Sequence, residues 1–333
     1  MRLASRSAAA ALGAGLLLHA AAGLATADCR SRPAAVGWPA WDSFAGTFIG
    51  DGARVIDPST PNGRTTSEGQ AYALFFALVA NDRARFERLL RWTEDNLAAG
   101  DLRAHLPAWL WGKRDDGSWG VIDDNPASDA DLWIAYALQE AARLWDIPRY
   151  AALGQLIAER ILREETVVVG GLGRVLLPAP KGFMPATDTV RLNPSYAPIQ
   201  LLRRLAAGSI SAESTAQWRA QIGTTRRLTI EGAPRGFVPD WVVYQAGQGF
   251  RTDADTAGVG SFNAIRSYLW AGMLAPSDPL RASLQRALAP MLQVTARTGT
   301  PPKQVDTRTG SGIGSGDAGF SAALLPMLSS LPG

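Results

Sequence analysis

The sequence predicts an all-α fold, a toroid in which inner helices alternate with outer helices. Two observations support this fold class. Apolar residues recur at helical spacing along nearly the whole chain, and the long apolar–polar alternation that is typical of strands is scarce. Segments that are apolar on almost every face alternate with segments that carry one apolar stripe. A helix that is apolar all round must be buried, whereas a striped helix can face water, so the alternation indicates two layers.

The predicted inner helices recur along the chain at nearly constant intervals. Five segments are apolar on almost every face: residues 68–80, 129–145, 195–206, 262–274 and 318–328. The candidate caps before them, spaced roughly 60 residues apart, are Ser67, Ser128, Ser195, Ser261 and Asp317. The striped segments between them are residues 83–98, 148–164, 212–229 and 279–295. This period predicts a repeated helical hairpin, an α/α barrel, and excludes a TIM barrel, which needs strands between its helices.

The first 27 residues have the layout of a secretory signal peptide. Arg2 and Arg6 precede an apolar run over residues 8–24, and Ala25-Thr26-Ala27 matches an A-x-A cleavage site. We therefore expect cleavage near the end of this motif and a periplasmic or secreted protein. The remaining residues, 28–333, are expected to form a single catalytic domain.

Composition excludes several classes of function. Removing Arg2 and Arg6 from the 33 basic residues leaves 31 against 30 acidic residues, so no basic footprint for nucleic acid remains. His105 is then the only histidine, which excludes multi-histidine metal sites, and no nucleotide-binding motif is present. The single cysteine, Cys29, excludes an internal disulfide framework. We expect neither a metal nor a cofactor, whereas eleven Trp and many acidic residues suit carbohydrate.

Polar residues at the starts of the inner helices indicate one shared site. In a toroid of helical hairpins all inner helices run in the same direction, so their N-termini lie on one rim. The side chains expected to converge there, the last of them one turn deeper, are Glu68, Asp129, Asp131, Tyr196, Asn263 and Arg266. The alternative is that each residue only caps its own helix. This explains a polar residue at one helix start more readily than polar residues at four helix starts.

Glu68 is the candidate proton donor on this rim. Cleavage of a glycosidic bond needs an acid on the leaving oxygen and a second carboxylate for the water or the anomeric carbon. Apolar neighbours such as Phe75 can exclude water and raise the pKa of Glu68, whereas the helix N-terminus lowers it. Asp129, from the next inner helix, can raise this pKa further.

Tryptophans before the second inner helix predict a groove for a polymer. The stretch 106–133 carries Trp109, Trp111 and Trp119. Indole rings can stack on the apolar faces of sugar rings, and carboxylates can hold sugar hydroxyls. We expect Trp109 and Trp111, together with Asp131, to bind substrate. The alternative is that such indoles only fill the core.

Eight stretches between about Trp38 and Leu328 match a known pattern. They read RVIDPS, TTSEGQAYALFFALVANDRARF, LPAWLWGK, ASDADLWIAYALQEAARLW, LNPSYAP, APRGFVPDWV, AIRSYLWAGM and GFSAALLPML. Together they resemble glycoside hydrolase family 8. The resemblance implies an (α/α)6 barrel and inverting hydrolysis of internal β-1,4-glucosidic bonds, the reaction of an endoglucanase or cellulase.

The resemblance is greatest to endoglucanases encoded with bacterial cellulose synthases. It implies a role in cellulose biosynthesis, with β-1,4-glucan as substrate and the cellulose synthase complex as a candidate partner; we expect a monomer. Glu68 in TSEGQ matches the general acid, and Asp129 in ASDAD matches the carboxylate that holds and distorts the sugar. Tyr196 in NPSY and Arg266 in AIR match residues that position the nucleophilic water and its base.

The resemblance fails at the general base. The related enzymes read S-Y-D-A-I-R where this chain reads SFNAIR, which places Asn263 at the position of the base. An amide cannot accept a proton from water, and losing such a group removes ~10²–10⁴-fold of rate. Asp253 or Asp255 in the preceding loop is a candidate substitute base, and Asp240 a weaker one. The alternatives are a catalytically weak glucan-binding protein, a changed residue, or a hydrolase of chitosan or xylan.

The C-terminal part of the resemblance indicates an incomplete last repeat. Related enzymes continue beyond the GFSAALLPML helix into a further helical segment, so we expect the last helix to be missing or shortened. An apolar flank is then exposed unless residues 38–48 or a partner covers it.

Overall fold

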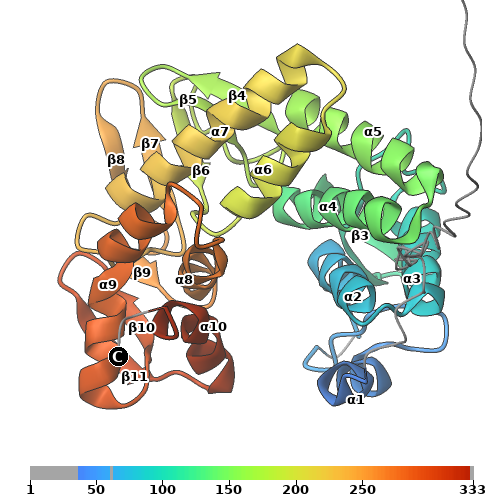
Figure 1. The fold of residues 1–333 in the computed structure, drawn as a ribbon, viewed down its shortest axis with the longest axis horizontal. Helices are drawn as coiled ribbons and strands as arrows, with labels where there is room; N and C mark the ends of the chain where they lie inside the picture. The colour runs from blue at the N-terminus through green and yellow to red at the C-terminus, as the bar shows by residue number, and fades with distance from the viewer. Residues whose placement is uncertain (1–36, 61–62, 331–333) are drawn as a thin grey trace, which may run out of the picture. The chain divides into compact units, whose positions relative to one another are not determined.

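The computed structural model describes residues 37–60 and 63–330 (Figure 1). All described residues belong to one compact unit, the second of the two into which the chain is divided (Ala35–Gly333). The predicted signal peptide lies outside the described residues. No helix in the described part is long and apolar enough to cross a membrane.

Inner and outer helices form the second unit (Figure 1). The inner helices are α2 (Ser67–Val79), α4 (Ser128–Trp145), α6 (Ile199–Gly208), α8 (Ala264–Met273) and α10 (Ala318–Leu328). The outer helices are α1 (Pro39–Phe48), α3 (Arg83–Leu97), α5 (Pro148–Glu164), α7 (Ala212–Glu231) and α9 (Arg281–Thr298). Helix α2 packs on α3 and α4, α4 on α5 and α6, α6 on α7, and α8 on α9 and α10. The predicted (α/α)6 fold class is confirmed.

The helix boundaries follow the apolar pattern, with one exception. Four of the five inner helices begin within two residues of their predicted starts. Helix α6 begins at Ile199 instead of residue 195, because Pro198 disfavours helical backbone at the residue before it.

The capping residues are harder to predict than the helix starts. The Asp317 carboxylate accepts hydrogen bonds from two backbone N–H groups at the start of α10, as predicted. The cap of α2 is Thr66, one residue before the predicted Ser67. The predicted cap of α8 was Ser261. The N–H groups of Ser261 and Ala264 at its start instead donate to the carboxylate of Asp240. Sequence pattern therefore places the helix start without identifying the acceptor.

Short antiparallel strands in the helix connections were not predicted. They are β1 (Thr65–Thr66), β2 (Ala108–Lys113), β3 (Trp119–Pro126), β4 (Thr166–Val169), β5 (Gly173–Leu176), β6 (Thr189–Leu192), β7 (Val242–Gln245), β8 (Gly249–Thr252), β9 (Val259–Gly260), β10 (Pro302–Asp306) and β11 (Ser311–Ser315). They form four small sheets with strand orders β1-β2-β3, β4-β5, β6-β7-β8 and β11-β10-β9. Strands of two to eight residues are too short for alternation to stand out. Strands β2 to β11 all lie in connections that lead from an outer helix to the next inner helix. The sheets therefore lie at the rim where the inner helices begin.

An apolar cavity of about 530 Å³ lies between α1, α2 and α8. Helix α1 covers the adjoining face of α2, where Trp41 and Phe44 pack against Phe76 at ring-centroid distances of 6.4 and 5.9 Å. Within the described ranges no sixth inner helix lies between α10 and α2. The apolar flank left by the missing last helix is therefore partly covered by residues 38–48, one of the two covers that the sequence predicted. Met273 on this flank is 47% exposed.

Replacing Gly272 by Ala should destabilise the protein although Ala favours helix. A Cβ atom at Gly272 would lie 2.5 Å from the backbone N of Met327 and 2.7 Å from the carbonyl carbon of Pro326, so α8 and α10 would have to separate. Overpacking of this kind costs about 1–3 kcal/mol. We expect the free energy of unfolding, measured in urea, to fall by that amount.

The matched control is Gly223→Ala in α7. A Cβ atom at Gly223 meets nothing within 4 Å, so this change should raise the free energy of unfolding by about 0.5–1 kcal/mol. Equal effects at the two glycines would contradict the close approach of α8 and α10.

Candidate active site

Glu68 lies in the first turn of α2, at the rim where the inner helices begin. The Thr66 hydroxyl caps this helix by accepting a hydrogen bond from the N–H of Gly69 at 3.2 Å. Trp109 Nε1 donates to Oε1 of Glu68 at 3.2 Å, and the Ser67 hydroxyl donates to Oε2 at 3.4 Å. The half-buried Glu68 carboxyl is therefore held from two sides.

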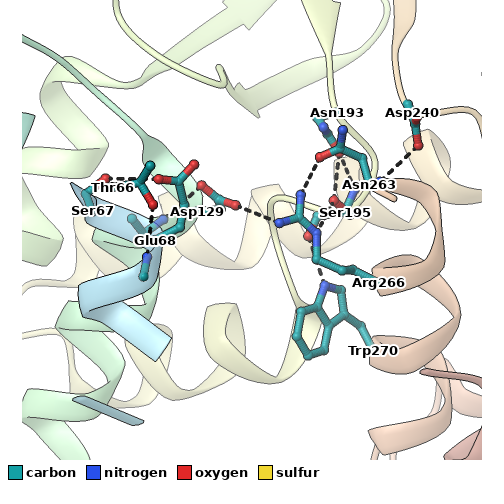
Figure 2. Close-up of polar contacts among 12 residues, drawn as sticks. Thr66, Ser67, Glu68, Asp129, Asn193, Ser195, Asp240, Asn263, Arg266 and Trp270 are labelled. Carbon is teal, nitrogen blue, oxygen red and sulfur yellow. Dashed lines mark hydrogen bonds and ion pairs between the residues drawn. The ribbon is translucent and has the colours of Figure 1, made fainter. Parts of the chain in front are cut away.

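Asp129 approaches Glu68 from the first turn of α4 (Figure 2). Its side chain is buried, and Oδ1 accepts a hydrogen bond from the N–H of Ala130 at 3.0 Å. Oδ2 lies 3.4 Å from Nη1 of Arg266 in α8. This ion pair joins two inner helices that are far apart in the sequence.

The Arg266 guanidinium organises the α8 side of the site. Besides Asp129, it contacts the Ser195 hydroxyl through Nε at 3.1 Å and Oδ1 of Asn263 through Nη2 at 2.7 Å. Its central carbon lies 5.5 Å from the centre of the Tyr196 ring. A planar guanidinium donates in fixed directions, so these contacts fix the relative positions of the four residues.

The Glu68 carboxyl titrates near neutrality. Burial, followed by the negative charge of Asp129, raises the pKa of Glu68 to about 7, while hydrogen bonds and the charge of Arg266 lower it in part. Burial also raises the pKa of Asp129, against the opposing effect of Arg266. Glu68 is therefore partly protonated at neutral pH, as a general acid must be.

Asn263 is bound on both sides at the start of α8. Its side-chain oxygen accepts from Arg266, and its backbone N–H donates to Oδ1 of Asp240 at 3.1 Å. The same oxygen of Asp240 accepts from the N–H groups of Ser261 and Ala264, both at 2.8 Å. Asp240 thus supplies the acceptor for the first N–H groups of α8.

A cleft of about 210 Å³ opens beside Glu68. Its wall includes Trp109, Phe183, Tyr196 and Trp241. Phe183 stacks on Trp241 at 5.6 Å with an interplanar angle of 14°, and Tyr196 lies 5.9 Å from Trp241. Sequence analysis missed Phe183 and Trp241. The stretch FVPDWV offered the only signal, an aromatic residue in a loop before an inner helix.

Trp111 lies outside the lining of this cleft. Its ring stacks with Trp119 at 5.3 Å, and the guanidinium of Arg54 lies 4.9 and 5.2 Å from the two rings. Trp92 packs edge-on against Trp111 at 5.4 Å. The structure therefore brings Trp109 to Glu68 and places Trp111 in a separate aromatic stack.

The remaining predicted carboxylates also lie outside the cleft lining. Asp131 is fully buried in α4. Asp253 accepts from Arg191 at 2.8 and 3.1 Å and from the Thr256 hydroxyl at 2.8 Å. Burial would raise the pKa of Asp253, but these hydrogen bonds outweigh it and the pKa is lowered. The Asp255 side chain is 80% exposed and lies 3.8 Å from Arg191.

This arrangement suits the cleavage of a glycosidic bond. Glu68, whose carboxyl titrates near pH 7, lines an aromatic cleft, and the buried carboxylate of Asp129 lies close to it (Figure 2). An oxocarbenium-like transition state needs such a pair of carboxyl groups. Among the described residues no group of three or more His, Cys, Asp or Glu side chains is placed to hold a metal ion.

Comparison with known proteins agrees with this chemistry. The model of glycosyl hydrolases family 8 matches residues 15–331. The chain belongs to glycosyl hydrolase family 8. As a family 8 protein it is a glycoside hydrolase, and the resemblance found in the sequence is confirmed.

Individual family 8 relatives match over most of the chain. An endoglucanase of Salmonella typhi is 48% identical over 295 residues, which cover 89% of this chain and 78% of that protein. An endoglucanase of Escherichia coli (strain K12) is 46% identical over 298 residues, 90% of this chain and 79% of that protein. The crystal structure of an endo-1,4-D-glucanase from Vibrio fischeri ES114 matches with a TM-score of 0.85 at 50% identity, covering 89% of this chain and 84% of that one.

Replacing Glu68 by Gln should stabilise the folded protein in a pH-dependent way. The pKa of Glu68 rises from its ordinary 4.5 to about 7 in the folded state, so ionisation is less favourable there than in the unfolded chain. This cost is absent below the unfolded pKa, grows between the two values, and is constant above the folded pKa. We expect the gain in free energy of unfolding to follow the same course.

Urea denaturation at a series of pH values measures this gain. Asp115→Asn, in the exposed turn between β2 and β3, controls for the loss of one negative charge. A gain for Glu68→Gln that is the same at every pH would contradict the raised pKa.

Proposed function

We propose that this family 8 enzyme is an endo-β-1,4-glucanase, a cellulase that hydrolyses internal glucosidic bonds with inversion at the anomeric carbon. The main support is the pairing of Glu68, whose pKa is about 7, with Asp129 beside the aromatic cleft. The relatives support the substrate class, because two of them are named endoglucanases and the third an endo-1,4-D-glucanase.

In this mechanism each side of the rim has its own task. Glu68 protonates the leaving oxygen, and the Trp109 N–H holds its carboxyl in place. Asp129 accepts a hydrogen bond from the sugar at the cleavage point, and its ion pair with Arg266 favours the carboxylate form against the effect of burial. Tyr196 and Arg266 order the attacking water from the α8 side.

The base that activates this water is proposed to be Asp255. Asn263 cannot take the proton, since its amide is not basic. Asp253 already accepts hydrogen bonds from Arg191 and Thr256, which hold it as a structural anion. Asp255 lies in the same loop before α8, and its 80% exposed carboxylate makes only a long ion pair with Arg191, at 3.8 Å.

We further propose that the enzyme acts in the periplasm or outside the cell, as a monomer, on glucan made by a cellulose synthase complex. The signal-peptide layout of residues 1–27 supports export. A second candidate function, a catalytically weak glucan-binding protein, is favoured by one observation, the amide at position 263.

Glu68→Gln should remove most of the hydrolytic activity. An amide cannot protonate the leaving oxygen, so kcat should fall by ~10²–10⁴-fold with little change in KM. The release of reducing ends from carboxymethylcellulose measures kcat, and the same assay on xylan and chitosan tests the substrate class. Activity within a few-fold of wild type would exclude Glu68 as the acid.

Asp255→Asn and Asn263→Asp together test the base. If Asp255 is the base, its amide variant should lose ~10²–10⁴-fold in kcat, and adding Asn263→Asp should restore much of this loss. If Asp255→Asn has no effect while Asn263→Asp alone raises kcat by a similar factor, the natural protein lacks a base. Retention of cellulose binding in that case would favour the glucan-binding function.

A further inference from the structure

Two carboxyl groups are buried together next to the catalytic rim. Asp131 lies in the first turn of α4, two residues after Asp129, and Glu165 follows the end of α5. Both side chains have no exposed surface, and the two carboxyl groups lie within hydrogen-bonding reach of each other. If both groups are ionised, none of their four oxygens has a hydrogen-bond partner among the described residues, because a carboxylate can only accept.

A hydrogen bond between two carboxyl groups requires a proton. Two carboxylates would repel each other, whereas one acid and one carboxylate form a strong O–H···O⁻ bond. Burial raises the pKa of both groups well above their ordinary values. The charge of Asp131 raises the pKa of Glu165 further, so the pair holds one proton between the two carboxyl groups.

Among the described residues no basic side chain pairs with Asp131 or Glu165. The other charges that shift their pKa values most are carboxylates: Glu68 of α2, Asp129 of α4 and Glu164 of α5. The arginines around it have other partners: Arg160 and Arg163 pair with Glu164, and Arg174 donates to the Thr166 hydroxyl. A shared proton is therefore the device that makes burial of both groups tolerable.

Backbone hydrogen bonds connect Glu165 to the start of the catalytic helix. The Glu165 carbonyl accepts from the N–H of Leu177 at 2.8 Å. The next residue, Pro178, accepts through its carbonyl from the N–H of Ser128 at 3.0 Å, at the first residue of α4. The first turn of α4 is thus held to the end of α5 by this backbone path and by the Asp131–Glu165 bond.

We propose that Asp131 and Glu165 share one proton and act as a positioning pair, which holds the first turn of α4 and thereby Asp129 in register with Glu68 and Arg266. The effect on catalysis rests on the proposed role of Asp129. Neither member of the pair is exposed to substrate, so both act through Asp129. Loss of the shared proton at high pH leaves two like charges side by side in a dry site and loosens the start of α4.

Glu165→Gln is the decisive variant, because its amide donates to Asp131 without a titratable proton. We expect kcat/KM within about two-fold of wild type at neutral pH. In wild type the melting temperature should fall at alkaline pH, and in Glu165→Gln the midpoint of this fall should lie at higher pH. Glu165→Ala removes the donor and should lower kcat by ~10-fold or more with little change in KM. Asp115→Asn, in the exposed turn between β2 and β3, controls for the loss of one negative charge and should leave all of these values unchanged.

Infrared spectroscopy of the neutral carboxyl group detects the shared proton directly. At about pH 8, above the pKa of Glu68 of about 7, the signal should persist in wild type and in Glu68→Gln and be absent from Glu165→Gln. This result does not depend on hydrolysis, so it can succeed even if the proposed glucanase activity fails.

Three results would overturn the proposal. One is Glu165→Gln losing activity as severely as Glu165→Ala, and another is an unchanged alkaline midpoint of melting. The third is that neither Glu165→Gln nor Asp131→Asn folds. Each variant keeps one donor and one acceptor in the pair, so the proposal requires that they fold.

Discussion

The active site depends on the ion pair between Arg266 and Asp129. These two side chains come from α8 and α4, and their contact, together with the Ser195 hydroxyl, joins three segments of the chain at one point. Both groups lie largely out of water, where removing one partner leaves an uncompensated charge. The pair therefore sets the distance between the α2–α4 side of the rim, which carries Glu68, and the α8 side, which carries Asn263.

Glu68 illustrates how opposing effects decide a protonation state. Its place in the first turn of α2 and the charge of Arg266 favour the carboxylate, whereas burial and the charge of Asp129 favour the acid. Burial is the largest of these effects, which is why a carboxyl at a helix N-terminus can serve as a proton donor near pH 7. The Trp109 indole lies next to the Glu68 carboxyl in the cleft and holds it in place by donating a hydrogen bond from Nε1 to Oε1.

The two cavities next to the rim differ in chemistry rather than only in size. The larger one, about 530 Å³, is walled mainly by aromatic and aliphatic side chains of α1, α2 and α8. The smaller one, about 210 Å³, combines aromatic rings with Glu68, Asp123 and Asn125. Arg266 lines the larger cavity, whereas the smaller one holds Glu68 and so offers the acid and the hydrogen-bonding groups that sugar cleavage needs.

The two helical layers and their boundaries could be predicted from the sequence, because burial on all faces or on one face leaves a direct mark on the apolar pattern. The family and the convergence of Glu68, Asp129 and Arg266 were also within reach of sequence reasoning, since the starts of inner helices share a rim. Side-chain partners distant in the chain could not be predicted. Asp253 pairs with Arg191, 62 residues away, and Asp240 caps a helix that begins 24 residues later.

Asp131 shows most clearly what only the tertiary structure decided. Residues two apart in a helix point in directions about 200° apart, so Asp131 cannot share the face of Asp129, and it meets Glu165 at the end of α5 instead. The sequence by itself determined which residues are polar at the rim, because composition and spacing are local properties. Which of them face the cleft, and which face each other, depended on how the helices pack.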